Sequence, residues 1–190
     1  FVTLRPPADL RAGSVSSSPF WFDMGELERA MAGARAILVN TPHNPTGHVF
    51  SRDELERIAF LCMKHNVLAI TDEVYEDLTY GHQHVRLATL SGMSERTITL
   101  SSLGKTFSLT GWKIGWAITT PELSRAVRAA HQFLTFATAT PLQIGAIAAI
   151  ERGGAYIASL RKQFAESREF LATTLASRGF GVVMPRGTYF

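Results

Sequence analysis

Short apolar runs rich in β-branched residues recur along the chain, and they predict strands buried in a sheet. Helical spacing of the apolar positions follows several of these runs, so strands and helices alternate. The region 5–20 holds three prolines and a serine cluster and predicts a loop. The predicted strands are residues 1–4, 36–40, 67–71, 97–101 and 114–119.

Helix starts can be recognised from their capping residues. A capping residue followed three positions later by glutamate is a capping-box spacing, and proline is favoured at the first helical position. The order strand, helix, strand predicts an α/β fold with a mostly parallel sheet and crossover helices. The starts are Asp23 with Glu26, Ser51 with Glu54, and Thr120 with Pro121.

After residue 120 the pattern changes from alternating strands and helices to helices alone. The spacing predicts helices over 121–132, about 141–151 and about 155–178, with Gly179 as the stop signal. The last segment, GFGVVMPRGTYF, returns to strand character, and its final GTYF reads as a strand just starting. We therefore expect a domain change between residues 155 and 180.

Composition places the chain among globular proteins with a packed core. It has 190 residues, of which 46% are hydrophobic and 18% charged, and its net charge of +3 is dispersed rather than gathered in a run. These features predict a soluble intracellular protein that binds neither nucleic acid nor membrane. The single cysteine, Cys62, excludes disulfide and cysteine–metal frameworks and reads as core filling. The chain begins without Met in an apparent strand, so we expect a piece of a longer protein.

Polar residues follow three of the predicted strands directly. AILVN is followed by TPHNPTG, VLAIT by DEVY, and TITLS by SSLGK. Ligands of open parallel sheets bind beyond the carboxyl ends of the strands, so these residues should meet at one edge. Each has an ordinary explanation by itself, as a cap, a turn residue or a solvated lysine. Together they predict a site made of Asn44, Asp72, Tyr75, Ser102 and Lys105.

Other ligand motifs fail on spacing. Residues 104–106 read GKT, but a phosphate-binding P-loop needs a glycine where Thr99 stands. The dinucleotide pattern G-x-G-x-x-G follows none of the strands. His82 and His84 form an H-x-H that could bind a metal, yet no further ligand lies near them in sequence. We therefore predict a polar loop there and no metal.

Three motifs in this order give the chain a family resemblance: NTPHNPTG at 40–47, DEVY at 72–75 and SSLGKTFSLTGWKIGW at 101–116. With them it resembles the pyridoxal-phosphate-dependent aminotransferases of class I/II, and most closely the branch of kynurenine aminotransferase, glutamine transaminase K and methionine aminotransferase. The similarity extends over nearly the whole chain and includes the stretch from YGHQHVRLATLSGM at 80–93 to HQF at 131–133. It implies an incomplete fold type I large domain at residues 1–155, followed at 156–190 by the interdomain helix and the start of a small α+β domain.

The resemblance also implies roles for individual residues toward pyridoxal 5′-phosphate. Lys105 matches the catalytic lysine, whose free amine forms the internal aldimine and then moves the proton between the substrate Cα and the cofactor. Asp72 matches the carboxylate that keeps the pyridine nitrogen protonated, so that the ring accepts electrons. Tyr75 and Asn44 match the residues that hydrogen-bond the cofactor O3′. The family also suggests a cis bond between Asn44 and Pro45.

Three more residues acquire a role by the same resemblance. Ser102 and Lys113 match the phosphate end of the cofactor, although many relatives carry arginine, which binds bidentately, at the position of Lys113. Phe136 matches an aromatic that crosses a dimer interface toward the substrate pocket of the partner subunit. With Phe133 it could equally be the apolar face of a helix.

The implied function is transamination between an amino acid and a 2-oxo acid by a cytoplasmic homodimer. No aromatic for stacking on the pyridine ring, no glycine-rich phosphate loop and no arginine for the substrate carboxylate can be assigned, so we expect little or no turnover from these 190 residues alone. Two alternatives stay open: β-lyase activity on cysteine S-conjugates at the same site, and a non-catalytic ligand-sensing domain. The amino donor cannot be read from these motifs.

Overall fold

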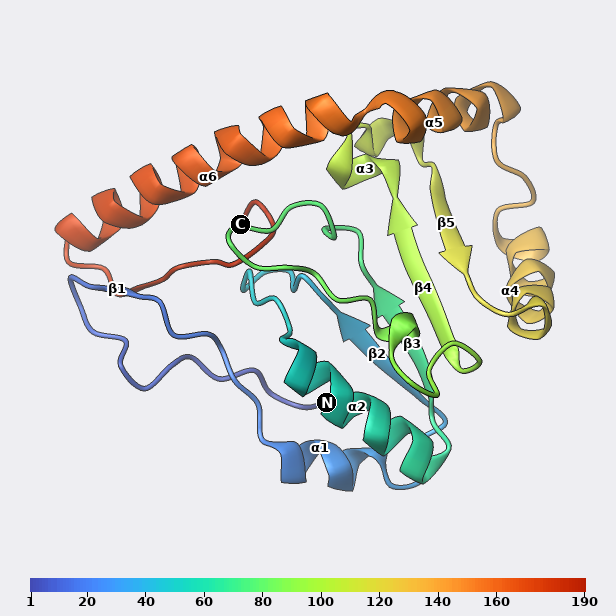
Figure 1. The fold of residues 1–190 in the computed structure, drawn as a ribbon, viewed down its shortest axis with the longest axis horizontal. Coiled ribbons are helices and arrows are strands. Elements are labelled where there is room, and N and C mark those ends of the chain that lie inside the picture. Colours follow the sequence, from blue (N-terminus) through green and yellow to red (C-terminus); the bar gives the residue numbers. More distant parts are fainter.

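A sheet of four strands forms the centre of the computed structural model, which describes residues 1–190. The strands are β2 (Ala36–Asn40), β3 (Leu68–Asp72), β4 (Thr97–Ser102) and β5 (Gly115–Ile118), and they lie side by side in that order. The first three run parallel, whereas β5 is antiparallel to β4 (Figure 1). The predicted mostly parallel α/β sheet is confirmed.

Two helices cover one face of this sheet. Helix α2 (Arg52–His65) makes the crossover from β2 to β3, and α1 (Met24–Met31) packs beside it. Both begin where the capping residues predicted. The Asp23 side chain accepts a hydrogen bond from the backbone of Glu26, and Ser51 and Glu54 form a complete capping box.

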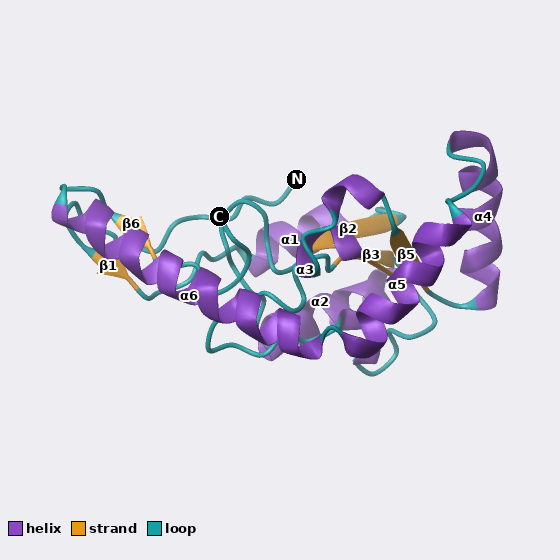
Figure 2. Cartoon of the chain, turned by 90° about the horizontal axis from the view of Figure 1, so that it is seen from above, coloured by secondary structure: helices purple, strands orange, loops and turns teal.

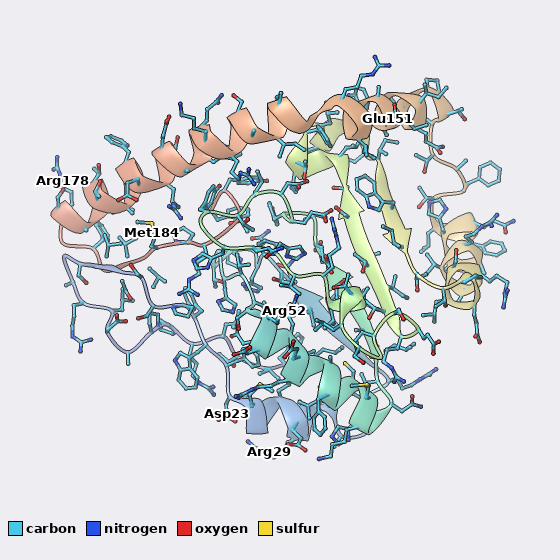
Figure 3. The ribbon with its side chains drawn as sticks, in the orientation of Figure 1. Asp23, Arg29, Arg52, Glu151, Arg178 and Met184 are labelled. Atoms are coloured by element: carbon cyan, nitrogen blue, oxygen red, sulfur yellow. The ribbon has the colours of Figure 1, made fainter.

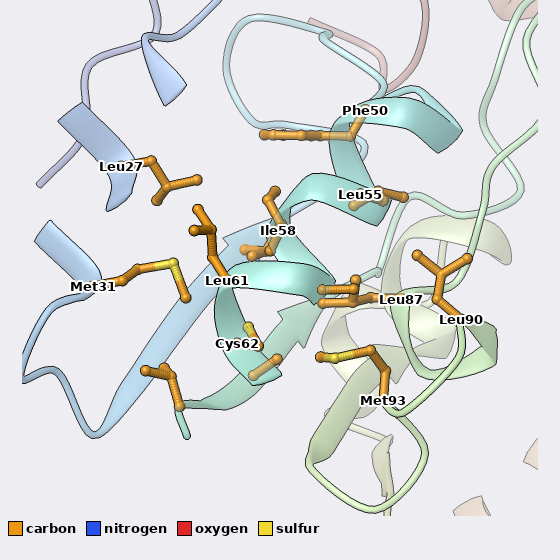
Figure 4. Close-up of a cluster of buried hydrophobic side chains, with 14 residues drawn as sticks. Leu27, Met31, Phe50, Leu55, Ile58, Leu61, Cys62, Leu87, Leu90 and Met93 are labelled. Carbon is orange, nitrogen blue, oxygen red and sulfur yellow. The ribbon is translucent and has the colours of Figure 1, made fainter. Parts of the chain in front are cut away.

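The core lies between the sheet and these two helices, and Figure 4 shows its side chains. Leu55, Ile58 and Cys62 of α2 are at most 2% exposed and meet Val39 and Ala69 of the sheet. Cys62 is a free, buried thiol, as predicted. On the other face Leu38 is 70% exposed, so the apolar strands are buried on one side only.

Helices dominate the second half of the chain. The short α3 (Leu103–Thr106) follows β4, and 3₁₀ turns lie at Leu87–Thr89 and Thr110–Trp112. Then come α4 (Pro121–Leu134), α5 (Thr140–Arg152) and the long α6 (Gly154–Ser177), close to the three predicted helices. Figure 1 shows α6 running along one edge of the molecule, and Figure 2 shows α4 standing away from the sheet.

The predicted strand at residues 1–4 is wrong, and the strand character predicted for GFGVVMPRGTYF is confirmed only at Val182–Val183. Residues 1–4 form no strand, and GTYF at the C-terminus is irregular. Instead, β1 (Val15–Ser16), inside the predicted loop, pairs in parallel with β6 (Val182–Val183). This contact joins segments far apart in sequence, so local periodicity does not reveal it. Figure 3 labels Arg178 at the end of α6 and Met184, which follows β6 and donates its backbone N–H to Ser16.

None of the helices combines the length and the apolar character that crossing a membrane requires.

Candidate active site

The carboxyl ends of β2 and β3 bring the predicted site residues Asn44 and Asp72 together through Asn40. Asn40 and Asp72 are directly paired across the two strands, and the Asn40 amide donates to the Asp72 carbonyl at 3.2 Å. The Asn40 side-chain oxygen accepts from the backbone N–H of Asn44 at 2.7 Å. The turn that carries Asn44 is therefore tied to the end of β3. The Asn44–Pro45 bond is cis, as the resemblance suggested, and so is Thr41–Pro42.

Tyr75 lies in the turn after β3 and is almost completely enclosed. Its side chain is 2% exposed, and this burial raises the pKa of its phenol, with smaller contributions from Tyr189 and Asp72. Tyr75 therefore remains protonated at neutral pH and can donate a hydrogen bond. The Asp72 carboxylate accepts from the backbone N–H of Val74, the residue before Tyr75, at 3.4 Å.

Lys105 reaches the same place from β4. Ser102 caps α3 by accepting from the backbone N–H of Gly104 at 3.3 Å, and Lys105 follows in the single turn of that helix. The Lys105 Nζ lies 5.8 Å from the ring centre of Tyr75, within the range of a cation–π contact. The amine and the buried phenol thus lie at the rim of the sheet where Asp72 ends β3.

Hydrogen bonds tie the turn after β3 to the chain on both sides of Lys105. The Ser101 hydroxyl donates to Glu76 at 2.8 Å, and the Thr106 hydroxyl donates to Asp77 at 3.2 Å. Each bond joins the segment of Tyr75 to the segment of Lys105. Their relative position is therefore held by side chains as well as by strand pairing.

Tyr189 also lies at this rim, and no motif in the sequence points to it. The Lys105 Nζ donates to its hydroxyl at 3.2 Å, and its ring meets Tyr75 edge to face with centres 5.4 Å apart. Burial opposes ionisation of Tyr189, but the hydrogen bonds with Tyr75 and Lys105 outweigh it and lower its pKa. It lies in the GTYF segment, 84 residues after Lys105 in the chain.

The remaining predicted residues differ in position. Lys113 is exposed at a left-handed turn, with φ of 55°, just before β5. Pairing of Gly115 with Ser102 keeps this turn near the N-terminal end of α3. Phe136 is 81% exposed beyond α4, and no contact brings it to the rim. The predicted assignment of Phe136 to a partner subunit is therefore not tested by one chain.

The H-x-H motif is not simply a polar loop, because the His84 side chain is only 6% exposed. Its Nε2 lies 2.7 Å from Glu73 Oε2, and Glu76 completes a group whose ligand atoms lie within 4.8 Å of one another. All four carboxylate oxygens of Glu73 and Glu76 already accept hydrogen bonds in this structure. The donors are His84, Thr71, Ser101 and Arg86.

A hollow of about 530 Å³ borders the site and is lined by Pro45, Thr46 and Tyr189, among others. The donor set at the rim fits pyridoxal phosphate: an amine for its aldehyde, a carboxylate for its ring nitrogen and a phenol for its hydroxyl. A hydroxyl and an ammonium at the start of α3 and the following turn suit its phosphate. A mostly apolar hollow of about 560 Å³ along β2 offers no such set.

Comparison with known proteins agrees with this chemistry. The family model described as "Aminotransferase class I and II" matches residues 9–190. Mouse kynurenine–oxoglutarate transaminase 3 is 45% identical over 184 residues, which cover 92% of this chain and 40% of that protein. A probable N-succinyldiaminopimelate aminotransferase from Mycobacterium tuberculosis is 45% identical over 173 residues, covering 90% of this chain and 44% of the relative.

Solved structures extend the comparison to the fold. N-succinyldiaminopimelate aminotransferase from Mycobacterium tuberculosis matches 90% of this chain and 45% of its own with a TM-score of 0.87 and 44% identity. Bna3p from Saccharomyces cerevisiae matches 99% of this chain and 46% of its own with a TM-score of 0.89 and 34% identity. The chain spans less than half the length of the curated relatives it matches. It belongs to the aminotransferase class I and II family and has the fold of part of a fold type I aminotransferase.

Proposed function

We propose that the protein carrying this chain is a pyridoxal-phosphate-dependent aminotransferase that exchanges an amino group between an amino acid and a 2-oxo acid. The observation that supports this most directly is the Lys105 amine. It lies between two phenols, 5.8 Å from the ring centre of Tyr75 and 3.2 Å from the Tyr189 hydroxyl, at the rim where Asp72 ends its strand. The bound cofactor supplies an electron-accepting ring, and the residues of this chain bind it, orient it and move protons.

Each residue has a role that its position supports. Lys105 carries the amine that reacts with the aldehyde and later moves a proton as general base and acid. Asp72 holds the ring nitrogen in its protonated form. Tyr75, kept neutral by burial, donates to the ring hydroxyl, and Asn44 reaches the same atom from the neighbouring turn.

Ser102 and Lys113 bind the phosphate in this proposal. A serine at a helix start and a lysine at the adjoining turn provide a hydroxyl donor and a positive charge. Lysine acts as a point charge and not as a fork, so the phosphate is held with less directional definition than by arginine.

The proposal includes a cytoplasmic homodimer in which Phe136 reaches the substrate pocket of the partner. Phe133, Leu134 and Phe136 are more than 80% exposed at the end of α4, which is the kind of apolar patch that a subunit interface covers. The named relatives act on different amino donors, so we propose an amino acid substrate without choosing among kynurenine, glutamine and methionine.

Borohydride reduction of the full-length protein loaded with pyridoxal phosphate tests the function. We expect the reduced cofactor on Lys105, identified by peptide mass, and a change in the visible spectrum when an amino donor is added. Lys105→Ala should lose both the label and transamination, because no other amine is placed to react. Matched labelling of Lys162→Ala, which removes an exposed lysine of α6 outside the site, serves as the control, since it keeps the reactive amine. A label on another residue, or full turnover by Lys105→Ala, would refute the assignment.

A further inference from the structure

Glu73 and His84 form a buried pair directly behind the proposed site. Their closest atoms, Glu73 Oε2 and His84 Nε2, lie 2.7 Å apart, and their side chains are 0% and 6% exposed. A carboxylate removed from water destabilises the fold unless donors meet its oxygens. The function proposed above gives this pair no role.

The second oxygen of Glu73 is held from the sheet. The Thr71 hydroxyl donates to Glu73 Oε1 at 2.8 Å, and it lies 3.3 Å from the Thr99 hydroxyl of the neighbouring strand. All of these groups are buried. Because both oxygens have partners on different elements, the direction of the Glu73 side chain is fixed.

Fixing Glu73 also fixes the residue before it. Side chains alternate along an extended strand, and Thr71 and Glu73, on either side of Asp72, are both wholly buried. The backbone N–H of Glu73 donates to Leu100 at 2.9 Å, which continues the pairing with β4. Asp72 must therefore point to the opposite side, toward the site, for as long as Glu73 stays anchored.

The same residue holds the turn that carries Tyr75. The Glu73 carbonyl accepts from the backbone N–H of Glu76 at 2.8 Å, which closes the turn around Tyr75. The charged groups around the pair are Arg86 on the loop of His84, and Glu76 and Asp77 on the turn itself. Arg86 is bound to Glu76, so His84 is the only side chain that meets Glu73 Oε2.

We propose that Glu73 and His84 are positioning residues that hold Asp72 and Tyr75 in place relative to Lys105. The inference rests on the proposed function, which gives those three residues their roles. His84 acts through Glu73, and neither touches the cofactor. Without the hydrogen bond from His84, Glu73 loses one of its two anchors and the carboxylate of Asp72 loses its fixed direction.

Titration of full-length apoprotein with pyridoxal phosphate, followed by absorbance, measures the effect. His84→Leu should weaken cofactor binding by about fivefold to tenfold, as expected for one lost buried hydrogen bond. His84→Gln should stay within about twofold of the unchanged protein, because its amide can still donate to Glu73. Equal losses in the two variants would overturn the proposal.

The visible band of the bound cofactor provides a readout that a general loss of stability would not move. A displaced Asp72 no longer keeps the ring nitrogen protonated, so positive charge near the Lys105 nitrogen falls and that nitrogen holds its proton more tightly. We expect the midpoint of the pH-dependent absorbance change to move to higher pH in His84→Leu and to return in His84→Gln.

Controls separate this proposal from folding and from the proposed function. His65→Leu removes a histidine whose Nε2 lies 4.0 Å from Glu28, away from the site, and should leave affinity and midpoint unchanged. If His84→Leu does not fold, Glu73→Gln combined with it removes the bare charge and should show the same weak binding. A folded variant with unchanged affinity and midpoint overturns the inference alone, whereas an unmodified protein that binds no cofactor overturns the function.

Discussion

The pKa values of the two tyrosines beside Lys105 are shifted in opposite directions. Burial raises the pKa of Tyr75, whereas hydrogen bonds with Tyr75 and Lys105 lower the pKa of Tyr189 against the effect of its own burial. Tyr75 is therefore the better donor of the two and Tyr189 the better acceptor. The Lys105 amine donates to Tyr189, which fits this difference. The same residue type serves two purposes because its surroundings differ.

The effect of burial on a tyrosine can be tested at Tyr80 through the pH dependence of stability. Burial raises the pKa of Tyr80 to about 12, and its hydroxyl donates to the Thr188 carbonyl at 2.6 Å. The folded state keeps this proton above pH 10, where the unfolded chain loses it. The stabilisation is therefore complete below about pH 10 and falls by at most about 1.4 kcal/mol per pH unit between about pH 10 and about pH 12. Tyr80→Phe should cost about 1 kcal/mol at neutral pH. Its deficit against the unchanged protein should shrink as the pH rises.

Urea unfolding of both proteins at about pH 8 and about pH 11 measures this convergence. Other groups that titrate in this range are shared, so they cancel in the difference. A deficit that stays constant over the range would show that the Tyr80 proton is not held more tightly in the folded state.

At the scale of elements, the residues that start a helix lie close together in the sequence and can be recognised there. Paired strands can lie far apart in the sequence, so their pairing cannot be recognised in this way. Ser51 and Thr120 were recognised as caps because the cap and its partners lie within four residues. The pairing of β1 with β6 joins residues 15–16 to 182–183, so each of these short strands has its partner far away in the sequence. The end of β3 can likewise be predicted from neighbouring residues, because polar residues follow its apolar run directly. The burial of His84 cannot, because it depends on a contact with Glu73 across a loop.

The capping box of α2 should contribute measurably to stability. Ser51→Ala removes the acceptor for the backbone N–H of Glu54 and should lower the free energy of unfolding by about 1 kcal/mol. Ser51→Thr keeps an oxygen at that place and should lose less than half as much. Urea unfolding of the unchanged protein and the two variants measures these differences in the free energy of unfolding. Equal stability of the alanine variant would mean that solvent satisfies the helix start as well as Ser51 does.

At the scale of the whole molecule, the sequence predicts which faces are apolar but not what covers them. The apolar periodicity predicts α4, α5 and α6 with bounds close to those observed. Several of their apolar side chains are nevertheless exposed. The 1–155 and 156–190 division stays a prediction, and β6, beyond α6, pairs back to the N-terminal region. The exposed apolar side chains include Phe133, Leu134, Phe136, Ile144, Ile147 and Ile150.

A site shared between two subunits predicts a result that differs from the one expected if Phe136 acted within its own subunit. If Phe136 of one subunit serves the site of the other, Lys105→Ala and Phe136→Ala disable different parts of each site. In a mixed dimer one site then receives an intact Lys105 and an intact Phe136, and the other receives neither. Random pairing of equal amounts should restore about a quarter of the unmodified activity, although each variant alone is impaired. Activity equal to the mean of the two variants, measured after subunit exchange, would place Phe136 outside the partner's site.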